Sequence, residues 1–231
     1  MKNIILCLII LFSGELLFSQ KIILHRNSGG NQVLYSSSID SITFLPFACG
    51  DEIRYEGQTY HTVLIGTQCW MKENLNVGIM IQGNTNQSNN GIIEKYCYNN
   101  DTANCSLYGG LYQWQEAMKY VSIPGAQGIC PDGWHIPTAA QFQTLKTAVN
   151  NDGNSLKAIG QGSGSGTGTN ISGFSALLAG ANWTGTFNAL TFETYFWQTD
   201  SQIICLFAFS PQINTYGWGQ NLGFSLRCLK N

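Results

Sequence analysis

Residues 130–145 read CPDGWHIPTAAQFQTL, and this stretch decides the fold class more than any other. Thr138 stands where a helix cap accepts backbone N–H groups, and Gln141 occupies the position from which a capping-box side chain reaches back. The apolar positions that follow are Phe142, Leu145 and Val149. Their spacing places them on one helical face, so the pattern predicts an amphipathic helix over 138–149 that packs against a core.

Turn signals divide the segment that follows Cys49 into hairpins. Glu56-Gly57 and Gly66-Thr67 are the turns, and short apolar runs flank each of them. The expected strands are residues 53–55, 60–64 and 68–71. The Asn- and Gly-rich residues 74–90 are expected to form a loop. A second helical stripe is expected over 110–121, formed by Leu111, Trp114, Ala117 and Met118.

Glycine marks a loop in the last third of the chain, and apolar runs mark strands. Residues 160–169 repeat Gly, Ser and Thr, and we interpret them as a flexible surface loop because the Lys of a phosphate-binding loop is missing. The expected strands are residues 174–178, 191–197, 203–209 and 224–229. Together these patterns predict an α+β fold with a twisted antiparallel sheet, two main helices and long loops.

Residues 1–19 have the pattern of a secretory signal peptide. Lys2 is followed by the uncharged run 4–12, and small Ser19 ends the segment. An uncleaved membrane anchor is the alternative, and it is disfavoured because Glu15 interrupts the about 18 apolar residues that a span needs. We expect an exported protein, secreted or on the outer cell surface of a bacterium, with no membrane span after cleavage.

The segment after the signal peptide, residues 20–48, predicts a small β leader that precedes the main domain at 49–231. Short apolar runs alternate there with turn-rich residues, which is typical of an antiparallel meander. The expected strands are residues 22–24, 33–35 and 42–44. The leader is too short to hold a core of its own, so it is expected to pack on the domain that follows.

The overall composition excludes several classes of protein. Charged residues make up 10% of the chain and hydrophobic residues 44%, with a formal net charge of −2. Such a chain is too apolar and too aromatic to be disordered. Because it contains no basic run, we expect neither nucleic acid nor an anionic membrane surface as a partner.

The cysteines fit an exported protein. Of the eight, Cys7 is removed with the signal peptide, and we interpret the remaining seven first as disulfide cysteines. Cys205 is the expected free thiol, because it lies in the apolar run 203–207, where a buried cysteine acts as a small hydrophobe. No CxxC occurs and the three histidines are isolated in sequence, so we predict neither a metal site nor a cofactor.

Five strings, in order along the chain, are similar to one protein family. They are IGTQCWMKENLNVG (65–78), YCYNNDTANCSLYGGLYQWQEAM (96–118), CPDGWHIPTAAQFQTL (130–145), FWQTD (196–200) and GFSLRCLKN (223–231). Residues 49–231 thereby resemble the Fibrobacter succinogenes major paralogous domain, which is widespread in exported Bacteroidetes and Fibrobacter proteins. The resemblance implies a C-type-lectin-like fold, related to formylglycine-generating-enzyme-type domains.

The expected disulfides are Cys97–Cys105, Cys130–Cys228 and Cys49–Cys69. The first closes a short loop across the turn-forming residues 99–101. The second is implied by the resemblance, because in that fold it ties the strand before the long helix to the final strand.

Binding is favoured over catalysis by the residues themselves. The related sulfatase-modifying oxidases bind copper through two nearby C-terminal cysteines, whereas Cys205 and Cys228 are 23 residues apart here. The chain has no Gly-x-Ser-x-Gly elbow and no paired histidines. It also lacks the Glu-Pro-Asn and Trp-Asn-Asp motifs of calcium-dependent lectins. A formylglycine-generating-type oxidase-like enzyme and a structural cell-surface interaction protein without a small ligand are the alternatives.

Aromatic and amide residues between 179 and 220 predict the binding surface. Rings supply stiff contact area and amides adapt their hydrogen bonds, a combination that suits sugar faces and protein epitopes. We expect loops at 179–188 and 211–221 to gather on one side of the sheet. The residues that they present are Trp183, Asn214, Tyr216, Trp218 and Gln220. Core packing of the same rings is the competing interpretation. The predicted function is a secreted or cell-surface, non-catalytic binding module for a glycan or an extracellular protein.

Overall fold

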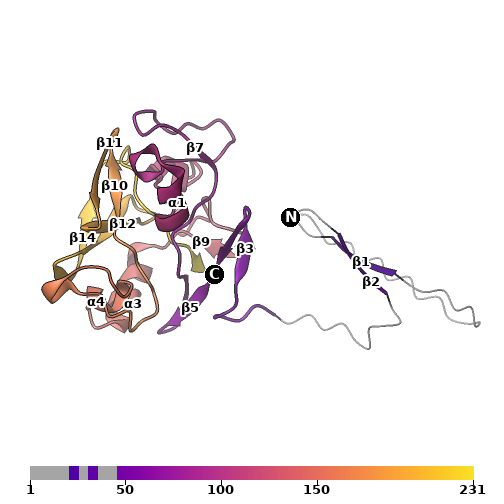
Figure 1. Ribbon diagram of the computed structural model, residues 1–231, viewed down its shortest axis with the longest axis horizontal. Coiled ribbons are helices and arrows are strands. Elements are labelled where there is room, and N and C mark those ends of the chain that lie inside the picture. The colour runs from indigo at the N-terminus through magenta and orange to yellow at the C-terminus, as the bar shows by residue number, and fades with distance from the viewer. Residues whose placement is uncertain (1–20, 26–30, 36–45) are drawn as a thin grey trace, which may run out of the picture. The chain divides into compact units, whose positions relative to one another are not determined.

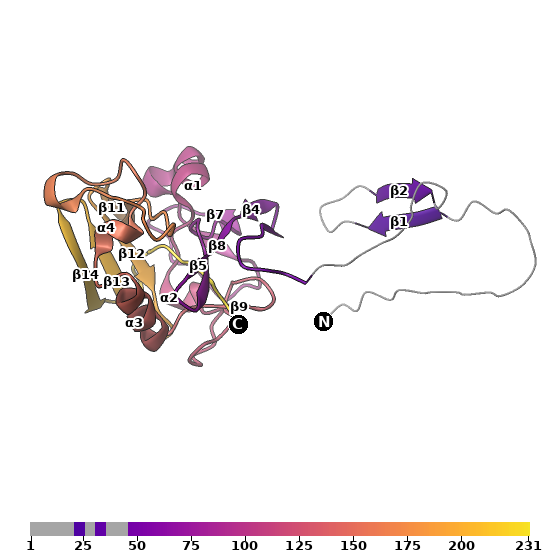
Figure 2. The same cartoon turned by 90° about the horizontal axis from the view of Figure 1, so that it is seen from below.

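The chain divides into two compact units, Met1–Pro46 and Phe47–Asn231. The computed structural model describes residues 21–25, 31–35 and 46–231 (Figure 1). The second unit contains two larger sheets and the helices (Figures 1 and 2). It also contains every disulfide of the described residues.

In the first unit, β1 (Lys21–His25) pairs antiparallel with β2 (Asn31–Tyr35). These strands include the first two apolar runs from which a β leader is predicted. The third predicted strand of the leader, at 42–44, and the predicted signal peptide, at 1–19, lie outside the described residues.

The four-stranded sheet of the second unit has the order β5-β6-β15-β9. Its strands are β5 (Thr62–Ile65), β6 (Gln68–Met71), β15 (Leu229–Lys230) and β9 (Trp134–His135). β5 and β6 form a hairpin that turns at Gly66-Thr67, as predicted. Leu229 pairs antiparallel with both Trp70 and His135, so the last strand of the chain is inserted between two strands that precede it by more than 90 residues.

The five-stranded sheet has the order β11-β10-β12-β13-β14. Its strands are β11 (Thr186–Leu190), β10 (Ala179–Trp183), β12 (Glu193–Trp197), β13 (Gln202–Phe207) and β14 (Ser210–Gly217). Gly180 of β10 pairs parallel with Thr194 of β12, and the other neighbours are antiparallel. The sheet is therefore mixed, and the prediction of a purely antiparallel sheet is wrong at this one pair.

Two segments predicted as loops contain strands instead. Residues 179–188 contain β10 and part of β11, and residues 211–221 contain most of β14. Their small, amide and proline residues do not have the apolar alternation of a strand. β14 is an edge strand, where a proline that cannot donate a hydrogen bond is tolerated. Conversely, 174–178 is not a strand, and within 224–229 only isolated bridges and the first residue of β15 occur.

The helices are α1 (Thr102–Tyr108), α2 (Trp114–Ala117), α3 (Ala139–Ala148) and α4 (Gly153–Leu156). α3 confirms the prediction, because Thr138 caps it and Gln141 completes the capping box. The second predicted helix, 110–121, is reduced to the single turn of α2, since Lys119 and Tyr120 adopt positive φ. Among the described residues, none of these helices is long and apolar enough to cross a membrane.

The remaining elements are short and belong to neither of the two larger sheets. They are the strands β3 (Ile53–Tyr55), β4 (Gln58–Tyr60), β7 (Ile79–Met80) and β8 (Glu94–Lys95) and the 3-10 helices η2 (Tyr98–Asn100) and η3 (Gly164–Gly166). β3 and β4 turn at Glu56-Gly57, as predicted, and Glu56 adopts the positive φ that this turn requires. Residues 74–90 form the expected loop apart from β7.

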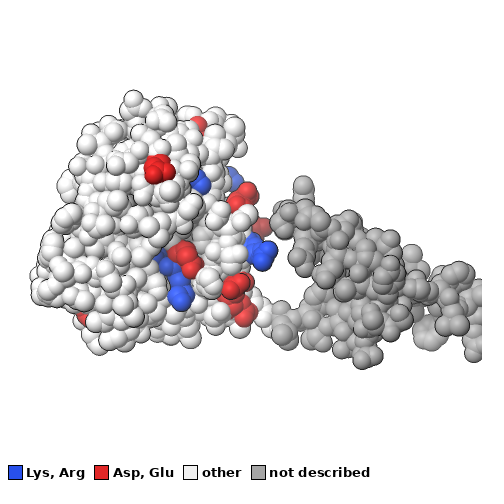
Figure 3. Space-filling view, viewed as in Figure 1, with Lys and Arg blue, Asp and Glu red and all other residues white. Residues whose placement is uncertain are grey.

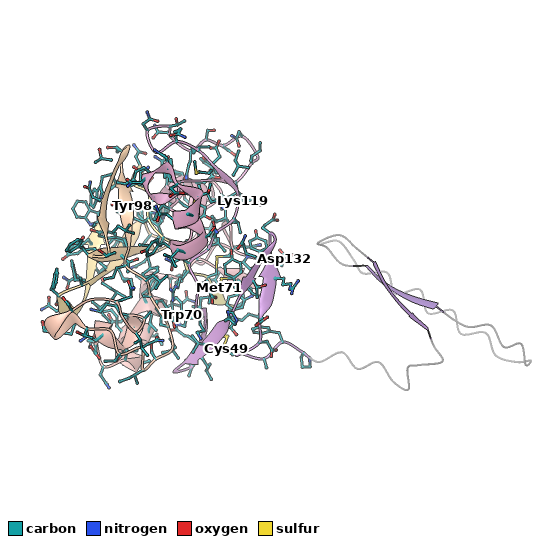
Figure 4. All side chains as sticks on the ribbon, viewed as in Figure 1. Cys49, Trp70, Met71, Tyr98, Lys119 and Asp132 are labelled. Carbon is teal, nitrogen blue, oxygen red and sulfur yellow. A yellow bond between two sulfur atoms is a disulfide. The ribbon has the colours of Figure 1, made fainter. Side chains whose placement is uncertain are left out.

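Two apolar clusters fill the interior on opposite faces of the five-stranded sheet. Tyr195 and Trp197 of β12 belong to one cluster, whereas Phe196 between them belongs to the other. This is the period-two alternation of a strand that is buried on both sides. Met71 and Trp70, labelled in Figure 4, divide between the clusters in the same way and are both 0% exposed.

All three predicted disulfides are present in the described part of the chain. Cys49 pairs with Cys69, Cys97 with Cys105, and Cys130 with Cys228. Cys49 is labelled in Figure 4, where its bond anchors the segment before β3 to β6. The long-range pair is Cys130–Cys228, which joins residues that are 98 positions apart in sequence.

Cys205 is the predicted free thiol, and in the described part of the chain it is unpaired and buried. Burial raises the pKa of its thiol far above the ordinary value, and Glu193 adds to the rise. Because the thiolate is the reactive form, we expect the native, oxidised protein without residues 1–19 not to react with a thiol reagent. One equivalent is expected after denaturation, and none in Cys205→Ala. Rapid labelling of the native protein would contradict this burial.

Candidate functional site

Tyr216 and Trp218 form an exposed aromatic pair at the end of β14. Tyr216 is 39% exposed and Trp218, directly after the strand, is 43% exposed. Their ring centroids are 6.3 Å apart with an interplanar angle of 67°. Partly buried Trp183, at the end of β10, packs edge-on against Trp218 with ring centroids 4.9 Å apart. We call these three rings, together with Asn214 and Gln220, the aromatic face.

The chain topology explains why rings from β10 and β14 meet. These strands are separated by β12 and β13, so strand pairing does not bring Trp183 to Trp218. After β14 the chain returns to β10, where Gly223 and Asn182 exchange two backbone hydrogen bonds of 2.8 and 2.9 Å. This return places the residues that follow β14 beside the end of β10.

Buried rings support the exposed ones. Trp183 contacts Tyr195 and Phe224 edge-on, with centroid distances of 6.0 and 5.8 Å. Tyr195 in turn stacks on Phe224 at 4.8 Å. Tyr195, Cys205 and Asn214 are in register across three strands and therefore lie on the same side of the sheet. The exposed pair thus rests on a packed aromatic layer, which limits its freedom to rotate.

The two predicted amides hold positions at the border of the aromatic face. Asn214 donates from Nδ2 to the hydroxyl of Tyr216 at 2.9 Å. The side-chain Oε1 of Gln220 accepts from the Nε2 of Gln115 at 3.1 Å, and the backbone carbonyl of Gln220 accepts from the backbone N–H of Trp114. The contribution of Gln115 was not predicted, because nothing in its local sequence indicates which distant residue it contacts.

Charge is sparse around the aromatic face. Between residues 179 and 222 the sequence contains only Glu193 and Asp200 as charged residues. In the view of Figure 3, the part of the molecule that contains the five-stranded sheet is almost free of charged side chains. Glu193 accepts a hydrogen bond from the hydroxyl of Tyr195, and burial raises the pKa of its carboxyl group. A ligand of this face therefore meets rings and amides, with little charge.

Contacts join four of the predicted site residues, Trp183, Asn214, Tyr216 and Trp218, whereas Gln220 follows two residues after Trp218 and is bonded to Gln115. They come mainly from strands and not from two long loops. Trp183 is the last residue of β10, and Asn214 lies within β14. Tyr216 is the second-last residue of β14, and Trp218 and Gln220 follow that strand. The competing interpretation, core packing, applies in part to Trp183 only, because Tyr216 and Trp218 are exposed. Within the described residues no group of three metal-ligating side chains occurs.

A family model, the Fibrobacter succinogenes major domain, matches residues 63–230. The chain belongs to this family. No curated protein and no solved structure matches it. In this Fibrobacter succinogenes major domain, the matched residues run from β5 into β15 and include the whole aromatic face. They also include Cys97–Cys105 and Cys130–Cys228, whereas Cys49 lies before the matched range.

Proposed function

We propose that this Fibrobacter succinogenes major domain is an exported, non-catalytic binding module that binds a glycan at the aromatic face. The observation that carries the proposal is the exposed pair Tyr216 and Trp218, whose rings are held at an angle and buttressed by Trp183. Exposed large rings in one cluster are a feature of interaction sites, because they lose little entropy on binding.

The chemistry of the face favours a neutral sugar over a protein epitope. The C–H faces of a sugar pack against rings, and its hydroxyl groups match the amides of Asn214 and Gln220. The interplanar angles of 67° and 85° give a corner, not a flat platform. A corner accommodates a single sugar unit of a free chain better than the flat surface of a crystalline polysaccharide.

Export is supported by the covalent structure. Three disulfides are typical of proteins that fold in an oxidising compartment. We also propose the C-type-lectin-like fold as the finer architecture. Its support is the final strand inserted between β6 and β9 and the bond from Cys228 to Cys130, which lies four residues before the start of β9.

The two alternatives have less support. For an oxidase-like enzyme, the cysteines of the C-terminal region would have to bind copper, but Cys228 is bonded to Cys130. For a structural interaction protein, the exposed aromatic pair Phe192 and Phe209, with centroids 5.9 Å apart, is the relevant feature. The aromatic face combines three contacting rings with an amide, Asn214, that is hydrogen-bonded to one of them, so it remains the better ligand site.

Trp218→Ala tests the proposed function. A glycan array first identifies a bound sugar, and we then expect Trp218→Ala to weaken its binding by more than about 1 kcal/mol, the level that separates anchors from filler contacts. The free energy of unfolding is expected to change by about 0.5–1 kcal/mol, because Trp218 is 43% exposed. Titration calorimetry and thermal melts measure the two quantities.

Phe209→Ala is the matched control, because it removes a 62% exposed ring outside the aromatic face. We expect it to leave glycan binding unchanged. Removing a buried aromatic side chain costs about 3–5 kcal/mol. A loss of stability of that size in Trp218→Ala would show that the ring is a core residue and would end the proposal. Equal weakening by both variants would also reject it.

A further inference from the structure

A cavity of about 470 Å³ opens between β4, the residues after β6 and α1, and it shares no residue with the aromatic face. Its polar lining includes His61, Lys72, Glu73, Tyr108 and Arg227. Figure 3 shows acidic and basic side chains next to each other on the part of the surface between α1 and β5, on a face that is otherwise mostly uncharged.

The wall of this cavity contains a buried guanidinium. Arg227 is 1% exposed and lies over the rings of Phe174 and Phe196, at 4.1 and 5.3 Å from their centroids. Its Nε donates to Oδ1 of Asn74 at 3.0 Å, and its two terminal nitrogens donate to the carbonyls of Phe174 and Ser175. Three of the five N–H groups of an arginine are thus used, and all three acceptors are neutral.

Arg227 has no anionic partner in the described part of the chain. The ion pairs found there both involve His61, and no carboxylate lies within 4.0 Å of the guanidinium. Burial lowers the pKa of Arg227 to about 9, and Glu73 partly opposes the fall, so the group is a cation at neutral pH. A buried cation without an anion is costly, because neutral carbonyls replace only part of its lost hydration.

A second cation and several unused polar groups line the same space. Lys72 is partly buried, and its Nζ makes no hydrogen bond to a described residue. The side chains of Gln58, Thr59 and Tyr108 likewise make no hydrogen bond within the described residues. Glu73 already has partners, because its two carboxylate oxygens accept from Nδ1 and the backbone N–H of His61, each at 2.8 Å.

We propose that this cavity binds a small, hydroxyl-bearing molecule with one carboxylate, of the size and chemistry of a hexuronic acid. Arg227 and Lys72 recognise the carboxylate, and Gln58, Thr59 and Tyr108 contact the hydroxyl groups. A planar guanidinium matches a carboxylate better than an ammonium does, and Lys72 adds a flexible charge.

The charge and the volume of the cavity select this class. Arg227 and Lys72 are its two cations and Glu73 its one carboxylate, so a monoanion balances the charge, whereas a dianionic phosphate is repelled by Glu73. A volume of about 470 Å³ lies in the range of about 300–1,000 Å³ that small-molecule sites occupy. A lone inorganic anion would leave most of this space and its hydroxyl-binding groups unused.

The test is titration calorimetry of the disulfide-bonded protein with three probes: sodium glucuronate, glucose and sodium sulfate. We expect glucuronate to bind at least about 10-fold more tightly than glucose or sulfate. Lys72→Gln is expected to weaken glucuronate binding at least about 5-fold without lowering the melting temperature, because the lysine has no structural hydrogen bond. Lys119→Gln, which removes the exposed lysine labelled in Figure 4, is the matched control and is expected to bind glucuronate normally.

Four results would overturn the proposal. They are no binding of glucuronate, equal binding of glucose, equal binding of sulfate, and Lys72→Gln binding like the wild type. Equal binding of glucose would show that the cations do not contribute, and equal binding of sulfate would show a simple anion site. Because Trp218→Ala lies outside the cavity, it is expected to bind glucuronate normally, which separates this site from the aromatic face.

Discussion

Replacing Cys130 and Cys228 with alanine is expected to lower the free energy of unfolding by about 4.7 kcal/mol. The bond joins residues 98 positions apart, and in the chain-entropy description the unfolded state gains more freedom the longer the loop that is opened. A domain of this size has a total stability of about 5–15 kcal/mol, so most of it is at stake. Denaturant unfolding, followed by tryptophan fluorescence, measures the change.

The double variant Cys97→Ala/Cys105→Ala is the matched control. Its loop spans only 8 positions, and the same relation gives about 2.6 kcal/mol. We therefore expect both variants to be destabilised, with the long-range variant the more affected by about 2 kcal/mol. An equal loss in the two would show that strain or lost packing, and not loop length, sets the contribution of these bonds.

Lys157→Met is expected to destabilise the domain by about 2–4 kcal/mol. Lys157 is 0% exposed, and its Nζ donates to the carbonyl oxygens of Gly166, Phe207 and Ser210. Methionine matches the length of the side chain but donates nothing, so it leaves buried carbonyls without a partner, each at a cost of about 1–3 kcal/mol. The lower desolvation cost of methionine offsets part of that loss.

Lys95→Met is the control for Lys157→Met. Lys95 is only partly buried, and its Nζ donates mainly to one side chain, Oδ1 of Asn76, at 2.7 Å. Water can replace this bond, so we expect a change of about 1 kcal/mol or less. Chemical denaturation of both variants decides the matter, and equal stability of Lys157→Met and the wild type would refute a structural role for the buried ammonium.

Lys157 also changes the interpretation of residues 160–169. Their glycines predict a flexible surface loop, and they do form a loop, but the lysine ties it to the turn between β13 and β14. A Cβ on Gly166 would collide with the backbone of Ala208, so close packing, and not flexibility, requires glycine at this position. The sequence contains no sign of that contact, because Ala208 is far away along the chain.

Features encoded within a few residues could be predicted from the sequence by itself. The capping box of Thr138 and Gln141 and the turns at Glu56-Gly57 and Gly66-Thr67 depend on neighbours in the chain, and all three are present. The buried thiol of Cys205 followed from its apolar surroundings. The pairing of Cys130 with Cys228 required the family resemblance, because no local pattern links residues so far apart.

Only the tertiary structure decided which distant segments pair. β14 has one buried side chain, Ile213, and is a strand because β13 supplies its hydrogen bonds. Trp218 contacts Trp183 because Gly223 returns to Asn182, and Arg227 borders a cavity because Asn74 and Phe174 accept its hydrogen bonds. The sequence lists the residue types of both sites, but their meeting depends on hydrogen bonds and burial between strands far apart in the chain, which no local pattern records.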